Sequence, residues 1–304
     1  MDTSARDPVA LGARSWPGRM VSIDGVELHV REVPDAASDA PPLVFVHGLG
    51  GSSLNFTAIG LLLADAGRGV AMDLPGFGRT PPREPPFGIT EHAELVESFL
   101  DDRYDEPVHL FGNSMGGSIA VHLAARRPDL VRTLTLVSPA LPDPRPRAVS
   151  AWFAAMATPR LGPAVLRRSA RLPFERRLEV GMSMIFGNRR ALPPEIIEAY
   201  EAELRRRDTD PWVADAVLAG AKSIVTAHLA PPRRSLWADA AKVRCAVLLV
   251  YGGRDRLVDA RVRNRAQAAF RDARLLYLPA SGHVAQIEHP DDVARAFRQL
   301  VRDH

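Results

Sequence analysis

The 304-residue chain has little of what several classes of protein depend on. Its single cysteine, Cys245, excludes an internal disulfide and any metal site built from cysteines. No stretch approaches the roughly 18 uncharged apolar residues of a membrane-spanning helix. The first 20 residues contain aspartate and proline where a secretory signal would need an apolar run. The sequence therefore predicts a soluble cytoplasmic protein that begins with a short mobile leader.

Lysine is also nearly absent, so that almost all of the 39 basic residues are arginine. Basic residues outnumber acidic residues between positions 140 and 235, whereas the remainder of the chain is slightly acidic. Such a segment suits weak association with an anionic lipid surface or attraction of anionic ligands, although a solvated helix surface is the simpler interpretation. No zinc-finger spacing, RNA-binding aromatic signature or recognition-helix pattern accompanies the charge, so no nucleic-acid partner is predicted.

Hydrophobic residues make up 46% of the chain and charged residues 25%, which is typical of a globular protein. Short apolar runs alternate with longer helical patterns, which predicts an α/β fold with a mostly parallel sheet and helices on both faces. Asp24-Gly25 is a favoured hairpin turn, so the first two strands should be antiparallel. Helices are predicted over Met115–Arg126 and from Pro290 onward. The predicted strands are Met20–Ile23, Glu27–Val33, Pro42–Val46, Gly69–Asp73, Val108–Gly112, Leu130–Ser138, Ala246–Tyr251 and Arg274–Leu278.

Residues 139–234 interrupt this alternation. The segment opens with the proline-rich sequence PALPDPRPR, ends near Pro231-Pro232, and has apolar residues at helical spacing between charged ones. We interpret it as a helical cap, or lid, inserted between two strands. The core domain would then comprise residues 1–138 and 235–304.

The sequence FGNSMGG at residues 111–117 fits the pattern G-x-S-x-G. It follows a predicted strand and opens a predicted helix, as a nucleophile elbow requires. The flanking glycines permit a sharp turn that exposes the Ser114 hydroxyl at the helix N-terminus, where backbone N–H groups favour negative charge. Ser114 is therefore the candidate nucleophile.

A glycine-rich turn, VHGLGG, follows the apolar strand at residues 42–46. Such a turn can present a backbone N–H to an oxyanion, and Leu49 is the best candidate. The second donor would be the N–H of Met115, directly after the candidate nucleophile. His47 is expected to support this loop rather than to react.

Asp255 and His283 each follow a late predicted strand, in the loops YGGRDRLVD and PASGHVAQIEHP. Ligand sites of open α/β sheets collect at the carboxyl ends of their strands. Histidine can accept and return a proton near neutral pH, and a carboxylate can fix its tautomer. Asp259 and His289 are local competitors for these two roles.

Together, these motifs resemble the α/β-hydrolase fold family over nearly the whole chain. The resemblance rests on HGLGG, DLPGFGRT at residues 73–80, GNSMGG, YGGRDRLV and GHVAQIEHP. It implies an eight-stranded sheet with an antiparallel second strand and a cap after the sixth strand. It also implies Ser114 as nucleophile, Asp255 as acid, His283 as base, and Leu49 and Met115 as oxyanion donors. Serine at the nucleophile position argues against the similar haloalkane dehalogenases and epoxide hydrolases, which use aspartate.

The substrate class is less sharply defined. Asn113 and the pattern HxAQxEHP also resemble hydrolases that cleave carbon–carbon bonds in ring-fission products, but Val284 stands where those enzymes usually have tryptophan. We therefore expect a serine esterase or lipase-like enzyme that acts on small-molecule esters without a metal or cofactor, as a monomer or homodimer. The alternatives are a carbon–carbon hydrolase of this type and a ligand-binding sensor on a hydrolase scaffold. The expected substrate-contacting residues are His47, Gly48, Asn113, Trp152, Phe153, Met184, Phe186 and Val284.

Overall fold

The computed structural model describes residues 16–34, 36, 40–143 and 148–304. Most of the predicted leader and part of the proline-rich stretch after residue 139 lie outside the described residues. No described helix combines the length and the hydropathy needed to cross a membrane.

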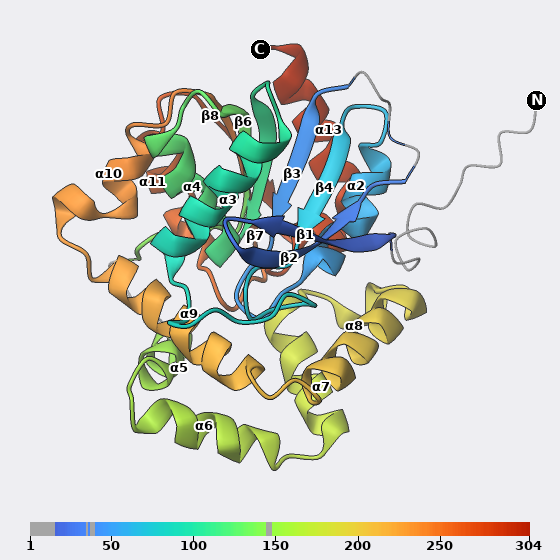
Figure 1. The fold of residues 1–304 in the computed structure, drawn as a ribbon, viewed down its shortest axis with the longest axis vertical. Coiled ribbons are helices and arrows are strands. Elements are labelled where there is room, and N and C mark those ends of the chain that lie inside the picture. The colour runs from blue at the N-terminus through green and yellow to red at the C-terminus, as the bar shows by residue number, and fades with distance from the viewer. Residues whose placement is uncertain (1–15, 35, 37–39, 144–147) are drawn as a thin grey trace, which may run out of the picture.

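One eight-stranded sheet forms the centre of the molecule, with strand order β1-β2-β4-β3-β5-β6-β7-β8 (Figure 1). β2 is antiparallel to β1 and β4, and the remaining neighbours are parallel. The predicted α/β-hydrolase sheet is therefore confirmed, with strand ends that differ by one or two residues. The strands are β1 Gly18–Ile23, β2 Val26–Glu32, β3 Pro42–Val46, β4 Arg68–Met72, β5 Val108–Asn113, β6 Val131–Val137, β7 Ala246–Gly252 and β8 Ala273–Leu278.

The hairpin between β1 and β2 forms as its sequence predicts. Asp24 and Gly25 have φ angles of 50° and 71°, and two consecutive positive φ angles are what a type I′ turn requires. The turn places Ile23 opposite Val26 and so sets the register of the pair.

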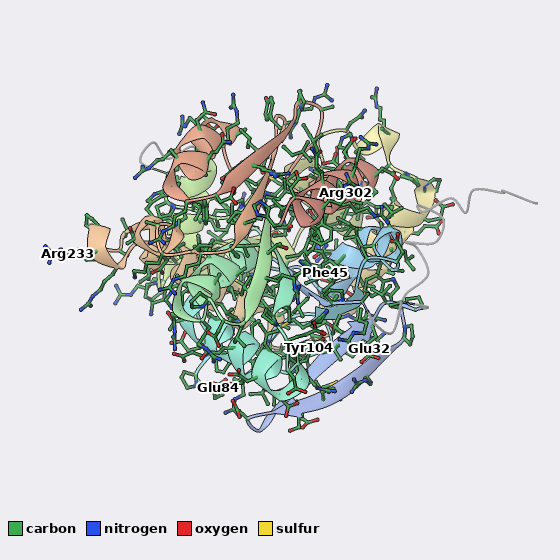
Figure 2. All side chains as sticks on the ribbon, turned by 90° about the horizontal axis from the view of Figure 1, so that it is seen from above. Glu32, Phe45, Glu84, Tyr104, Arg233 and Arg302 are labelled. Atoms are coloured by element: carbon green, nitrogen blue, oxygen red, sulfur yellow. The ribbon has the colours of Figure 1, made fainter. Side chains whose placement is uncertain are left out.

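Helices cover both faces of the sheet (Figure 1). The side chains of β3 show why: all are buried, with Val44 and Val46 in one apolar cluster and Leu43 and Phe45 in another. Phe45 lies at the centre of the molecule, whereas Arg233 lies at its edge (Figure 2). The helices flanking the sheet are η1 Ser53–Phe56, α2 Thr57–Leu62, α3 Ile89–Arg103, α4 Met115–Arg126, η3 Pro232–Arg234, α10 Leu236–Ala240, η4 Ala260–Val262, α11 Arg263–Ala269, α12 Ala285–Glu288 and α13 Pro290–Arg302.

Between β6 and β7 the chain leaves the sheet and forms a run of helices, here called the inserted helical segment (residues 148–228). These helices lie together at one end of the sheet, toward which the parallel strands point (Figure 1). They are α5 Ala148–Met156, α6 Leu161–Ala170, α7 Phe174–Ile185, η2 Arg189–Ala191, α8 Pro194–Arg207 and α9 Val213–His228. The segment therefore stands over the carboxyl ends of the strands.

Candidate active site

Ser114 occupies a strained turn between β5 and α4. Its backbone angles are φ 56° and ψ −118°, in a region that costs a non-glycine residue free energy. The surrounding backbone holds it there: the Ser114 N–H donates to the carbonyl of Val137 at 3.0 Å, and its own carbonyl accepts from Ala140 N–H at 3.0 Å. The turn is thus a nucleophile elbow in its geometry.

Two glycines let the elbow pack tightly. A Cβ atom on Gly112 would lie 2.5 Å from the carbonyl oxygen of Gly116, and a Cβ atom on Gly116 would overlap the carbonyl oxygen of Val46. Neither position accepts a side chain unless backbone moves. The close approach brings the start of α4 against the end of β3, where the glycine-rich turn begins.

That glycine-rich turn lies directly against Ser114. A Cβ atom on Gly48 would lie 2.8 Å from Ser114 Cβ and 3.4 Å from Ser114 Oγ. Within the described part of the chain, the backbone N–H groups of Leu49 and Met115 donate to no protein acceptor. Two uncommitted N–H groups, one of them at a helix N-terminus, are what a developing oxyanion requires.

The His47 ring lies behind this turn and is fully buried. Its Nε2 accepts from the Leu74 N–H at 3.0 Å, so its Nδ1–H is the donor to the carbonyl of Gly48 at 2.8 Å. Burial lowers the pKa of His47, which keeps the ring neutral. With both ring nitrogens occupied, His47 supports the loop and is not placed to contact substrate.

The Asp73 carboxylate stabilises the same region through its hydrogen bonds. One carboxylate oxygen accepts from the Ser53 N–H at 2.6 Å, and the other pairs with His29 Nδ1 at 2.8 Å and accepts from the Arg79 N–H at 2.9 Å. Burial alone would raise the pKa of Asp73, but these hydrogen bonds lower it to about 2. The group is therefore a buried carboxylate at neutral pH.

Asp255 and His283 meet at the carboxyl ends of β7 and β8. The His283 Nδ1 and Asp255 Oδ2 atoms are 2.9 Å apart, and both side chains are buried. Asp255 Oδ1 accepts from the N–H groups of Leu257 at 2.8 Å and Val258 at 2.9 Å. The carboxylate is thus fixed by its own loop and holds one nitrogen of the imidazole, leaving Nε2 for other chemistry.

The pKa of Asp255 is lowered despite its burial. Burial acts to raise it, but the charge and hydrogen bond of His283, the Val258 N–H and the nearby Ser138 hydroxyl outweigh that effect. Ser138 lies just after β6 and has a φ of 44°, so a second strained serine stands beside the Asp255 carboxylate. The sequence patterns did not single out Ser138.

Asn113 ties the elbow to the His283 loop. Its Nδ2 donates to the carbonyls of Val137 at 3.0 Å and His283 at 3.1 Å, which places the His283 backbone beside the residue that precedes Ser114. Asn113 is buried and its side chain connects the elbow to the His283 loop; its predicted contact with substrate stays a prediction. In the described structure the Ser114 hydroxyl makes no hydrogen bond, so nothing there holds it away from the imidazole.

The remaining predicted substrate contacts fall in different places. Phe186 and Val284, next to His283, belong to one buried apolar cluster between the inserted helical segment and the body. Met184 is half-buried on α7, and Phe153 packs against the main cluster of the body. Trp152 is 43% exposed and lies in none of these clusters, so its position gives no support for a lining role.

Asp259 and His289, the alternative candidates for the acid and the base, make contacts away from the candidate site. Asp259 Oδ1 accepts from the Arg261 N–H at 3.0 Å and caps η4. His289 lies 4.0 Å from Asp292 at the start of α13. Among the residues that the structure describes, no group of three or more histidine, cysteine, aspartate or glutamate side chains is arranged to hold a metal.

One structural neighbour of the site was not foreseen from the sequence. A Cβ atom on Gly220 of α9 would overlap the Leu49 side chain and lie 3.4 Å from Met115 Sδ. α9 thus covers Leu49 and Met115, the two predicted oxyanion donors. The only sequence signal is a glycine within a helical pattern, which does not reveal its partner.

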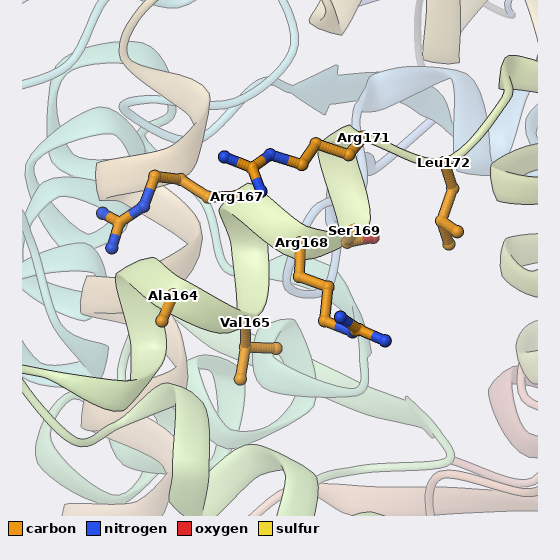
Figure 3. Close-up of a pocket in the computed structure, with 7 residues that line it drawn as sticks. All are labelled: Ala164, Val165, Arg167, Arg168, Ser169, Arg171 and Leu172. Atoms are coloured by element: carbon orange, nitrogen blue, oxygen red, sulfur yellow. The ribbon is translucent and has the colours of Figure 1, made fainter.

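A separate groove of about 610 Å³ lies on α6, and no residue of the elbow or of the Asp255–His283 pair lines it (Figure 3). Arg167, Arg168 and Arg171 line it, together with Leu172. Within the described chain, none of these guanidinium groups forms an ion pair. The excess of basic residues between positions 140 and 235 therefore includes exposed arginines near α6 that, among the described residues, have no acidic partner.

Comparison with known proteins places the chain in a family. The model of the α/β hydrolase fold matches residues 41–290, so the chain belongs to the α/β-hydrolase fold family. The hydrolase class is therefore supported.

Three relatives show how varied the chemistry on this scaffold is. The chain is 28% identical over 289 residues to a dihydrolipoyllysine-residue acetyltransferase component of an acetoin cleaving system from Cupriavidus necator, covering 94% of this chain and 68% of the relative. It is 26% identical over 274 residues to a pimeloyl-[acyl-carrier protein] methyl ester esterase from Neisseria meningitidis, covering 89% and 96%. The solved structure of haloalkane dehalogenase DbeA from Bradyrhizobium elkani superposes with a TM-score of 0.73 at 24% identity, covering 94% and 98%.

Proposed function

We propose that this protein is a serine hydrolase that cleaves carboxylic esters through an acyl-enzyme. His283 Nε2 takes the proton of the Ser114 hydroxyl as its oxygen attacks the ester carbonyl. The N–H groups of Leu49 and Met115 bind the oxyanion, and His283 then gives the proton to the departing alcohol. Water, deprotonated by the same imidazole, attacks the acyl-enzyme and releases the acid and the serine hydroxyl.

The Asp255–His283 hydrogen bond beside the strained Ser114 elbow is the observation that carries this proposal. A buried carboxylate with a lowered pKa can stabilise the imidazolium formed when His283 takes a proton. Catalytic hydrogen bonds to the nucleophile often tighten only when substrate binds, so the unbonded Ser114 hydroxyl is compatible with this role.

Serine as the nucleophile favours ester chemistry over dehalogenation. The haloalkane dehalogenases that this chain resembles use aspartate at that position, whereas a serine nucleophile forms an acyl-enzyme with an ester. The Neisseria relative is named as a methyl ester esterase and the Cupriavidus relative as an acetyltransferase, and both names describe acyl chemistry. We infer hydrolysis rather than acyl transfer as the simpler use of the same intermediate.

We also propose that α6 associates with anionic lipid surfaces. Arg160, Arg167, Arg168 and Arg171 are exposed around this helix, and Leu161 and Leu172 beside them are 55% and 42% exposed. Basic side chains next to exposed leucines are suited to a negatively charged membrane interface. Figure 1 shows α6 at the end of the molecule farthest from the C-terminus, where a flat surface can reach it.

The ester hydrolase proposal is tested with p-nitrophenyl esters of graded acyl length. We expect turnover by the wild type and a loss of about 10³-fold or more in Ser114→Ala, because serine is the group that forms the covalent intermediate. A ring-fission dienoate serves as the competing substrate. Equal ester turnover by the two proteins, or turnover of the dienoate alone, would refute the proposal.

A further inference from the structure

The loop that carries His283 is bonded to the inserted helical segment as well as to the sheet. The His283 N–H donates to the carbonyl of Ile185, the last residue of α7, at 2.7 Å. A Cβ atom on Gly187 would lie 2.6 Å from both the carbonyl oxygen of Ala280 and the nitrogen of Gly282. The turn after α7 and the His283 loop therefore pack backbone against backbone.

Glu288, the last residue of α12, joins these two segments with its carboxylate. Its Oε1 atom accepts from the N–H groups of Gly187 at 2.8 Å and Asn188 at 3.2 Å. Its Oε2 atom accepts from the Gly282 N–H at 2.6 Å and from the Ser281 hydroxyl at 3.3 Å. One side chain thus accepts two hydrogen bonds from each segment, and these four hydrogen bonds are here called the Glu288 joint.

This arrangement requires a carboxylate. An ionised carboxylate offers acceptor sites on both oxygens and carries no proton, so it can receive all four donors. A glutamine of the same shape offers one acceptor oxygen, and its NH₂ group would face two donors. Glu288→Gln therefore places an NH₂ group against two of the four donors, while the volume of the side chain stays the same.

The Asp255 loop is attached to the same place. The Arg254 N–H donates to the carbonyl of Ser281 at 2.8 Å, and the Gly253 N–H donates to the carbonyl of Leu278 at 2.9 Å. The loops of Asp255 and His283 and the turn after α7 thus form one bonded unit.

We propose that Glu288 is a positioning residue that fastens the turn after α7 to the His283 loop. Through this joint, the orientation of the His283 ring depends on the inserted helical segment being seated on the body. The catalytic part of the inference rests on the proposed function of His283 as the base. The positional part does not, because it concerns only where the ring lies.

The test compares Glu288→Gln with Glu179→Gln. Glu179 is an exposed glutamate of α7 that pairs with Arg176 and, among the residues that the structure describes, makes no hydrogen bond to the His283 loop, so Glu179→Gln is a matched loss of charge. We expect kcat to fall roughly 10- to 100-fold in Glu288→Gln with KM changed less than about threefold, because a displaced base affects the transition state more than binding. Glu179→Gln should keep wild-type values.

A proton NMR measurement reads the position of His283 without any turnover. We expect the Nδ1–H of His283, bonded to Asp255, to give a low-field signal that is lost in His283→Ala. We expect this signal to shift or broaden in Glu288→Gln and to stay in place in Glu179→Gln. A Glu288→Gln protein that matches Glu179→Gln in both kcat and signal would overturn the proposal.

Gly187→Ala is the second variant. It keeps Glu288 but wedges a methyl group between the turn and the His283 loop, so it should lower kcat and move the signal in the same way. If Glu288→Gln fails to fold, these two readouts on Gly187→Ala decide, and unchanged values would overturn the proposal. Failure of the ester hydrolase proposal would appear separately, as a wild type no more active than Ser114→Ala.

Discussion

At the level of single residues, the strained positions gather at the candidate site. Asp24, Ser114 and Ser138 are the non-glycine residues with positive φ in the described chain. Asp24 forms the β1–β2 turn, whereas Ser114 forms the elbow and Ser138 lies beside Asp255. Such conformations persist only where the surroundings impose them, and they concentrate where function needs a fixed geometry.

Asp73 gives a pH-dependent prediction. Its pKa of about 2 in the folded protein lies below the ordinary value of 3.8, so its contribution to stability is present above about pH 4 and is lost as the pH falls toward 2. We expect Asp73→Asn to lower the free energy of unfolding by at least about 2 kcal/mol at pH 7. The deficit should shrink between pH 4 and 2.

Urea titrations of wild type and Asp73→Asn over this pH range make the measurement. Asp65→Asn is the control, because Asp65 is an exposed carboxylate that pairs with Arg298 at the surface. A deficit that stayed constant from pH 7 to pH 2 would contradict the assignment of a buried, ionised Asp73.

At the level of secondary structure, the sequence was most informative where chain-breaking residues stand next to apolar runs. The helix predicted over Met115–Arg126 is α4 residue for residue, because the sharp turn at Ser114 precedes it and Pro128 follows. The helix predicted from Pro290 is α13, with proline at its first position. The candidate site residues Ser114, Asp255 and His283 could be named because each follows a recognisable strand.

Contacts between distant segments could not be predicted in this way. Glu288 joins residues about 100 positions apart, and α9 covers Leu49 although nothing near Gly220 indicates it. The lining role expected for Trp152 rested on helical spacing, which does not say which face of α5 is covered. Such pairings are set by how elements pack, and one sequence carries little information on them.

α6 gives a prediction at this level. We expect the wild type to float with vesicles that contain phosphatidylglycerol and not with phosphatidylcholine alone, because each arginine near an anionic surface contributes about 1 kcal/mol. Joint substitution of Arg167, Arg168 and Arg171 by glutamine should abolish flotation, and added salt should weaken it.

The control for this experiment replaces Arg233, Arg234 and Arg244 by glutamine, which removes the same charge from exposed positions outside α6. This variant should float like the wild type. Equal loss in both variants, or a wild type indifferent to lipid charge, would contradict the assignment of α6.

At the level of the whole molecule, the described residues form three buried apolar clusters, and two of these join the inserted helical segment to the body. Two of them lie on the faces of the sheet, and the third joins α7 and α8 to Val284 beside His283. The third cluster and the Glu288 joint meet the body at the same loop. The candidate site therefore depends on both parts of the chain being folded.

Cys245 provides a probe of this global folding. Burial, with a further contribution from the charge of Asp272, raises the pKa of its thiol to about 12, so the reactive thiolate is scarce in the folded protein. We expect alkylation by iodoacetamide at pH 8 to be at least about 100-fold slower in the native protein than in the unfolded chain.

Labelling across a urea series should follow the same transition as circular dichroism, because the partly buried Cys245 packs against the main apolar cluster and is fully exposed only when that packing is lost. Labelling of native protein at the unfolded rate would contradict this account of the thiol.

The central claim is that Ser114 is a nucleophile activated by His283. Its most direct measurement is intact-mass analysis after exposure to a fluorophosphonate, followed by peptide mapping of the adduct. We predict one adduct per chain, located on Ser114, absent from Ser114→Ala and formed at least about 100-fold more slowly in His283→Ala. An adduct on another residue, or none on the folded wild-type protein, would contradict the claim.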